Sequence, residues 1–122
     1  MSETLLTIHD LFQYAAMIAV LAAIWEGFRG GLGPRVFDAA GWVLRIQLVL
    51  GIIVWLVNSG WNLGAVQGVI HPIAGVAAVG AAEIYTARGN RVTDGSGSRT
   101  KGMGFAIALA LVIAAIGLAE VA

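Results

Sequence analysis

The chain has 122 residues, of which 59% are hydrophobic and only 11% are charged, and its mean hydropathy is +0.88. A water-soluble domain of this size cannot cover so much apolar surface with polar side chains, so the expected solvent is lipid. Seven basic and seven acidic residues cancel and cysteine is absent, which argues against nucleic acid as a partner and excludes disulfides, thiolate metal sites and iron–sulfur clusters.

Four apolar stretches are long enough to cross a bilayer, because about 30 Å of hydrocarbon takes roughly 20 helical residues. They are Leu5–Gly27, Phe37–Asn58, Leu63–Ala87 and Lys101–Ala122. The links between them are short or rich in glycine, and the last one, residues 88–100, is expected to be a mobile polar loop. We therefore predict an all-α protein, with residues 1–122 forming one integral membrane domain, an up-down-up-down four-helix bundle.

The cationic residues predict how this bundle is oriented, because lysine and arginine are retained in cytoplasmic loops. They flank only the first and third links, at Arg29, Arg35, Arg88, Arg91, Arg99 and Lys101. Both termini are therefore expected on the extracytoplasmic side. The tryptophans agree with an aromatic belt at each interface, inner for Trp25 and Trp42, outer for Trp55 and Trp61. No organellar targeting segment is visible, so a bacterial plasma membrane is the expected location.

Arg45 is the charged residue that lies deepest, about eight residues or roughly 12 Å into the second span. A charge at this depth needs a partner. Glu83 on the third helix and Glu26 on the first can each meet Arg45 inside the bundle, and we interpret the group as a structural ion pair. A proton or anion pathway is the alternative. The carboxylates near helix ends are expected to anchor the helices at the interface, namely Glu26, Asp38, Glu83 and Glu120.

The two histidines carry the functional signal of the sequence. His9 begins the first helix and His71 lies early in the third, which runs parallel to the first. His9 is 20 residues before Arg29 and His71 is 17 before Arg88, so their depths differ by only about 4.5 Å. Two such imidazoles on separate bundle helices are what haem iron takes as axial ligands. Two interfacial side chains, bonded to headgroups, water or backbone carbonyls, are the alternative.

A flat macrocycle also needs room beside these ligands. The helical face below His71 carries only small residues, which are Ala74, Gly75, Ala78 and Ala82. Gln13 lies one turn from His9, within reach of a haem propionate or of the unligated imidazole nitrogen. We predict a cofactor site formed by His9, His71, Gln13, Ala74, Gly75 and Ala78. Ordinary close packing of membrane helices explains the small face equally well.

Pro72 follows His71 directly and cannot donate the backbone hydrogen bond of a continuing helix. The third helix must either bend or begin here. A start at Pro72 leaves only 16 residues before Arg88, about 24 Å, which is short for a span. We therefore expect a bend that frees a carbonyl near Gly68 and re-aims His71 into the bundle. His71 as an interfacial cap is the other possibility.

The sequence from Ile8 to Ala87 resembles a known family pattern. His9 opens one helix, His71 opens the next but one, and between them stands Gln47-Leu48-Val49-Leu50-Gly51-Ile52. The pattern is similar to one four-helix half of a haem A synthase, or to a small bis-histidine transmembrane cytochrome b. The resemblance implies ligation of haem iron by His9 and His71. It departs from the family in having one half and no carboxylate just before His9, which implies a haem-holding bundle without oxidation of a haem methyl group.

The leading hypothesis is thus a haem b protein or subunit that carries single electrons near the outer face, rather than an enzyme. The first alternative is a non-catalytic subunit of a larger respiratory or photosynthetic membrane complex. A small multidrug transporter is a third class, but such transporters place a lone carboxylate deep in the first helix, whereas Glu26 stands at its inner end. The expected partners are the lipid bilayer and other membrane subunits or a second copy of the chain.

Overall fold

The computed structural model describes all residues except 1, 58, 60, 61, 63, 65, 94 and 122, and it also leaves out the side chains of residues 2, 3, 6, 66, 67, 116 and 118–121. Its helices are α1 (Ser2–Phe28), α2 (Arg35–Val57), α3 (His71–Arg91) and α4 (Gly97–Val121), with a short π-helix, η2 (Val66–Ile70), before α3. The described residues contain no strand. The predicted all-α class is confirmed. The predicted span ends at Asn58, Leu63 and Ala122 and the predicted belt residue Trp61 lie outside the described residues.

Among the described residues, four segments are long and apolar enough to cross a membrane, which makes the chain a multi-pass membrane protein by helix length and composition. They are Thr7–Phe28, Arg35–Val57, Gly68–Arg91 and Gly97–Ala115. The loop predicted for residues 88–100 is wrong in its extent, because α3 continues to Arg91 and α4 begins at Gly97. The extra turn of α3 ends with Arg88 and Arg91, whose charges complement the negative end of the helix dipole.

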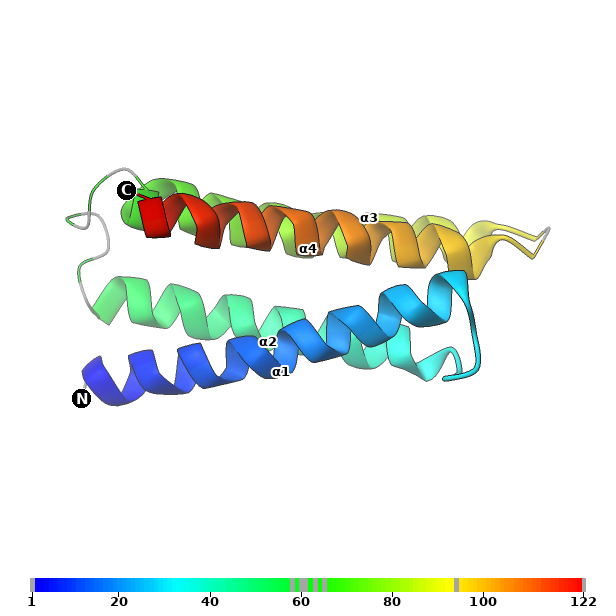
Figure 1. Cartoon of the computed structure of the whole chain (residues 1–122), viewed down its shortest axis with the longest axis horizontal. Coiled ribbons are helices and arrows are strands. Elements are labelled where there is room, and N and C mark those ends of the chain that lie inside the picture. The colour runs from blue at the N-terminus through cyan, green and yellow to red at the C-terminus, as the bar shows by residue number, and fades with distance from the viewer. Residues whose placement is uncertain are drawn as a thin grey trace.

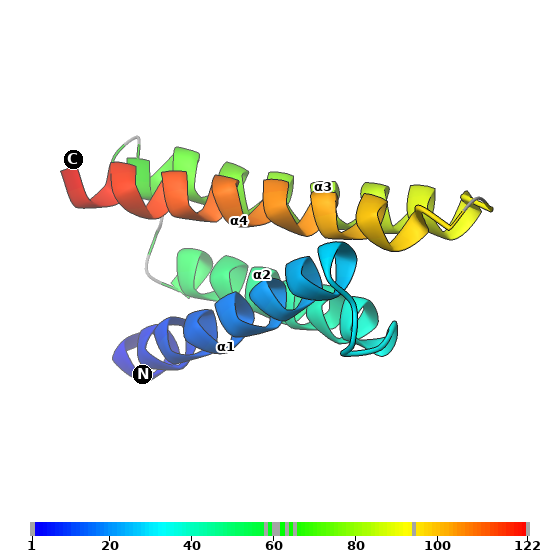
Figure 2. The same ribbon diagram turned by 45° about the vertical axis from the view of Figure 1, so that its right-hand side comes forward.

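The helices lie in two layers, one formed by α1 and α2 and the other by α3 and α4, and the two helices of each layer run antiparallel (Figure 1). Each helix packs against its two neighbours around the bundle, α1 against α2 and α4, and α3 against α2 and α4. The contact between α3 and α4 is the most extensive, and that between α2 and α3 is the smallest. Figure 2 shows the same pairing from a second direction, with α1 and α2 below α3 and α4. The described start of α1 and end of α4 lie at one end of the bundle, together with the end of α2 and the start of α3.

Glycines allow two close helix contacts at one end of the bundle. A Cβ atom added to Gly27 of α1 would lie 2.5 Å from the Cα of Gly102 of α4, a separation that real Cβ atoms do not adopt. Gly89 near the end of α3 is equally close to the carbonyl oxygen of Gly97, at 2.6 Å from an added Cβ. Both contacts lie toward the end of the bundle where the α1–α2 and α3–α4 connections are. Small residues thus hold this end together, as they do in membrane helix pairs generally.

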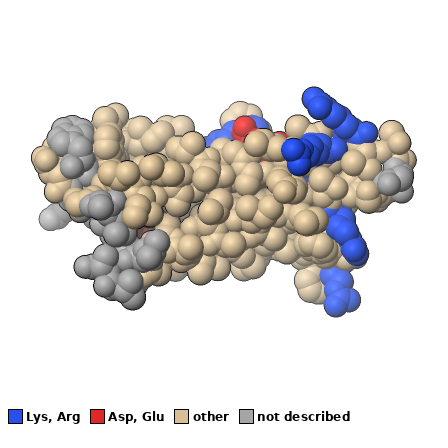
Figure 3. All heavy atoms as spheres, turned by 90° about the horizontal axis from the view of Figure 1, so that it is seen from above, with Lys and Arg blue, Asp and Glu red and all other residues tan. Residues whose placement is uncertain are grey.

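The hydrophobic core occupies the same half of the bundle. Its buried members are Val20, Ala23, Phe37, Ala40, Leu44, Ala78, Ala82, Phe105 and Ala108. The rings of Phe37 on α2 and Phe105 on α4 stack across it, with centroids 6.3 Å apart and planes inclined by 21°. His9 and His71 belong to the opposite half. Lysine and arginine side chains gather toward the end nearer the core (Figure 3).

The side chain of Glu26 is hydrogen-bonded to the turn that connects α1 and α2. Its Oε1 accepts hydrogen bonds from the backbone N–H groups of Leu32, at 2.7 Å, and Gly33, at 2.8 Å. The carboxylate therefore satisfies two donors of a turn instead of only anchoring the helix at the interface. This contact also removes Glu26 from the candidates for a partner of Arg45.

Candidate functional site

His9 lies partly buried in the first half of α1 and faces α2. Its imidazole lies against Gly51, where an added Cβ would be 3.2 Å from the ring atom Cε1. One turn earlier on α2, the side-chain Nε2 of Gln47 donates a hydrogen bond to the backbone carbonyl of His9 over 3.2 Å. Gln47 and Gly51 thus form one face of α2 that receives both the backbone and the ring of His9. Reasoning from the sequence named these two residues only as part of a resemblance and did not place them in the site.

His71 is the first residue of α3 and is also partly buried. The helix does not begin at Pro72, because η2 runs directly into α3 and Ile70 between them has helical angles, φ −65° and ψ −44°. Helical backbone therefore runs across Pro72, which lies in the first turn of α3, and the predicted bend stays a prediction. The break that the proline imposes is absorbed in a π-helical turn before it, a form that is rare in proteins and frequent at functional sites.

The carbonyl oxygen of Gly68, four residues before Pro72, accepts a hydrogen bond from another helix. In an α-helix the N–H of residue 72 would bond to the carbonyl oxygen of Gly68, but proline has no N–H. The indole Nε1 of Trp55 on α2 donates to this oxygen instead, over 2.9 Å. A side-chain donor is thus present at Gly68, the carbonyl for which the prediction expected the loss of the main-chain donor. Trp55, expected only as an outer-interface marker, turns its polar edge into the protein.

The two histidines belong to the same half of the bundle, His9 early in α1 and His71 at the start of α3. In the described part of the chain, the buried side-chain polar atoms without a hydrogen-bond partner are His9 Nδ1, His71 Nδ1 and Gln47 Oε1. Buried polar atoms are normally paired. His9 and Gln47 belong to the contact between α1 and α2, and His71 begins α3 at the same end of the bundle (Figure 1). This region is therefore the strongest candidate for a binding site.

The other residues predicted for this site fall in two groups. Gln13 on α1 and Ala74 on α3 are partly buried, each about one turn beyond its histidine. Gly75 faces α2, where an added Cβ would be at ordinary contact distance, 3.7 Å, from Leu48 Cδ1. Ala78 is 1% exposed and belongs to the hydrophobic core. Close helix packing thus explains the small side chain at Ala78. Of the small face, only Ala74 and Gly75 lie within about one turn of His71.

The donor set offered here is two imidazoles. Among the described residues, no group of three or more histidine, cysteine or carboxylate side chains could hold a metal ion. A bare ion bound by His9 and His71 alone would lack the further protein ligands that zinc sites use. A haem iron needs only two axial ligands from the protein, because the porphyrin nitrogens supply the rest. The residues present therefore fit a haem better than a mononuclear metal site.

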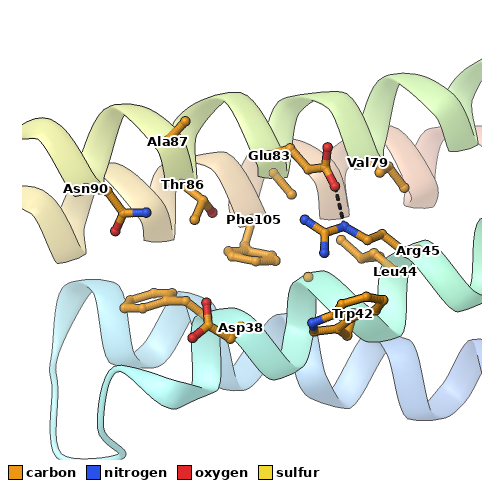
Figure 4. A pocket seen from close by; sticks show the side chains of 13 residues that line it. Asp38, Trp42, Leu44, Arg45, Val79, Glu83, Thr86, Ala87, Asn90 and Phe105 are labelled. Carbon is orange, nitrogen blue, oxygen red and sulfur yellow. Dashed lines mark hydrogen bonds and ion pairs between the residues drawn. The ribbon is translucent and has the colours of Figure 1, made fainter.

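A second polar group lies in the other half of the molecule, where Arg45 Nε donates to Glu83 Oε1 in an ion pair between α2 and α3. The prediction of an ion pair is confirmed with Glu83 as the partner. Its predicted place inside the bundle is wrong, because both side chains are 45% exposed. Phe37, Leu44 and Phe105 are buried and line the apolar part of a pocket between the two helices, and the ion pair lies in the same pocket (Figure 4).

By their length and composition, the four apolar helices of the described residues define an α-helical membrane protein, and the region of His9, Gln47 and His71 is its candidate cofactor site. Comparison with protein families, curated proteins and solved structures finds no match to this chain. Its function must therefore be argued from the site itself.

Proposed function

We propose that this chain is a membrane-embedded b-type haem protein or subunit, in which His9 and His71 are the axial ligands of one haem that carries single electrons. The observation that supports it most is that Nδ1 of both imidazoles is buried without a hydrogen-bond partner, as is Oε1 of Gln47 beside His9. Ligand histidines normally bind iron through one ring nitrogen and hydrogen-bond through the other. Gln47 already donates to the backbone carbonyl of His9, and its Oε1 is the acceptor that we assign to the other ring nitrogen in the haem-bound form.

The proposed orientation places both termini outside an up-down-up-down bundle in a bacterial plasma membrane. The basic residues of the first and third links support this, because they favour the cytoplasmic side. His9 and His71 belong to the opposite half of the bundle, so the haem would lie near the outer face. Electron exchange with a partner on that side, or with another membrane subunit, follows from this placement.

Each residue of the site has a role in holding and orienting the cofactor. His9 and His71 present imidazoles from two helices, while Gly51 leaves space for the His9 ring and Gln47 fixes its backbone. Trp55 ties α2 to the π-helical turn that leads into His71. The bound haem would supply one-electron exchange at its iron. The protein supplies burial and ligand geometry, which set the reduction potential.

A redox difference spectrum of the purified chain tests the proposal directly. Protein made in haem-replete cells should show a Soret band and a sharp reduced α-band typical of bis-histidine ligation. His9→Ala and His71→Ala should each abolish the α-band, whereas Asp10→Asn, a change of an exposed side chain beside His9, should retain it. A colourless wild-type preparation without extractable haem would refute the proposal and favour the non-catalytic subunit.

A further inference from the structure

The pocket between α2 and α3 holds a set of polar groups that the proposed haem site does not use. It has a volume of about 300 Å³, at the lower end of the range for small-molecule sites. Its floor is apolar and includes the core residues Phe37, Leu44 and Phe105. Figure 4 shows Asp38, Trp42 and Arg45 rising from α2 on one side and Glu83, Thr86 and Asn90 from α3 on the other.

The polar groups form two levels along the membrane normal. Arg45 and Glu83 form the deeper level, and Asp38 and Asn90 lie seven residues nearer the basic end on their respective helices. Seven helical residues correspond to about 10 Å. One turn beyond Arg45 and Val79, toward the membrane centre, Val49 and Val76 are exposed at 55% and 56%. The surface thus changes from carboxylate, through guanidinium, to apolar side chains as it descends into the membrane.

The charges of the pocket favour a bound cation at the level of Asp38 and Asn90, which is the one nearer the basic end of the bundle. Arg45 and Glu83 neutralise each other, and Asp38 contributes one further negative charge. Thr86 and Asn90 add neutral oxygen acceptors at that level. Lys101, whose Nζ lies 5.3 Å from the centre of the Phe37 ring, does not line the pocket. Arg45 uses Nε for Glu83, and its guanidinium has further N–H donors for an anion.

We propose that this pocket binds the headgroup of a zwitterionic phospholipid with a primary ammonium, drawn from the leaflet on the basic side. The ammonium lies at Asp38, the phosphate at the free guanidinium N–H groups of Arg45, and the acyl chains along Val49 and Val76. The order ammonium, phosphate, hydrocarbon in such a lipid is the order in which the pocket presents its partners. Charge-assisted hydrogen bonds at both ends distinguish it from an anionic lipid that lacks the amine.

Lipid retention by the full chain tests this assignment. Delipidated protein in mild detergent is titrated with dioleoyl phosphatidylethanolamine, and bound lipid is counted by native mass spectrometry. We expect one lipid per chain, with affinity about tenfold above that for phosphatidylglycerol and about tenfold lower in Asp38→Asn, as the loss of a charge-assisted bond predicts. Asp10→Asn is the matched control, because it removes an exposed carboxylate at the opposite end, and it should bind as wild type does.

A change in the lipid removes the ammonium without changing the protein. N-acetylated phosphatidylethanolamine has no cationic nitrogen and should bind wild type about as weakly as phosphatidylglycerol does. Equal binding of the acetylated and free lipids overturns the proposal, as does an Asp38→Asn variant that folds and retains the lipid. A homodimer that carries no lipid also overturns it, because a second copy would then cover the pocket.

Discussion

Trp55 on α2 donates its indole N–H to the carbonyl oxygen of Gly68 over 2.9 Å, and Gly68 lies four residues before Pro72, whose missing N–H would be the donor to this oxygen in a regular α-helix. A side chain from another helix thus bonds to the acceptor for which the proline offers no donor. An unpaired carbonyl in a membrane interior is costly. The π-helical turn before His71 is therefore tied to α2, and the direction of His71 depends on that tie.

Trp55→Phe keeps an aromatic ring and removes the donor. We expect it to lower the free energy of unfolding by about 1–3 kcal/mol, the cost of leaving a buried acceptor unsatisfied, and to broaden or shift the reduced α-band through His71. Denaturant titration in detergent, followed by circular dichroism, measures the first effect. Trp25→Phe, at a 56% exposed position, is the control. Equal losses in the two variants would show that the indole bond contributes nothing specific.

Pro72→Ala restores the missing N–H and should make the Trp55 bond dispensable. Gly68 then regains a donor within its own helix, so Trp55→Phe should cost less in the Pro72→Ala background than in wild type. A double-mutant cycle on unfolding free energies measures this coupling, which we expect at about 0.5–3 kcal/mol for groups sharing one acceptor. Additive effects would mean that Trp55 and Pro72 act independently.

Gly51→Ala tests the contact between α2 and the imidazole of His9. The added methyl group would lie 3.2 Å from Cε1 of His9, so the ring must move by a few tenths of an ångström or more. We expect reduced haem content per purified chain and a shifted α-band, with helix content unchanged. Gly41→Ala on the same helix, where an added Cβ meets nothing within 4 Å, should retain wild-type haem content. A Gly51→Ala protein with unaltered spectrum would place the His9 ring elsewhere.

Gly27→Ala addresses the packing of α1 against α4. Its Cβ would stand 2.5 Å from the Cα of Gly102, and because the obstacle is backbone, the helices themselves must separate. We expect a loss of about 1–3 kcal/mol in unfolding free energy, as for other overpacked sites. Gly117→Ala meets nothing within 4 Å and should be neutral or slightly stabilising. Similar stabilities for both variants would contradict the close approach.

The sequence predicts the number of helices and their class well, because length and hydropathy alone decide which segments can span a membrane. It predicts helix ends less well. Residues 88–100 have the composition of a loop, yet α3 keeps Arg88 and Arg91 and α4 begins at Gly97. Glycine is a poor helix former in isolation. The close contact of Gly89 with Gly97 indicates that the packing of α3 on α4 determines where α3 ends and α4 begins.

The sequence does not predict how each helix is rotated about its own axis. The depths of His9 and His71 follow from counting residues, whereas the faces of Gln47 and Gly51 do not, since apolar residues surround α2 on all sides and no polar stripe marks its inner face. The same reason explains Arg45. Its partner could be inferred from depth and charge, but its position on the outer side of the bundle depends on Phe37 and Phe105 filling the interior.

The last prediction concerns the ion pair between Arg45 and Glu83. The two side chains are 45% exposed on a surface expected to face lipid, so neither can rely on water to stabilise a lone charge. Arg45→Gln or Glu83→Gln alone should therefore lower the yield of folded protein more than the double variant Arg45→Gln/Glu83→Gln, which leaves no charge without a partner. Yield from the membrane fraction and the unfolding midpoint in detergent measure the effect, with wild type as reference. If the double variant loses as much as the two single losses combined, the charges act separately, and the pocket reaches water instead of hydrocarbon.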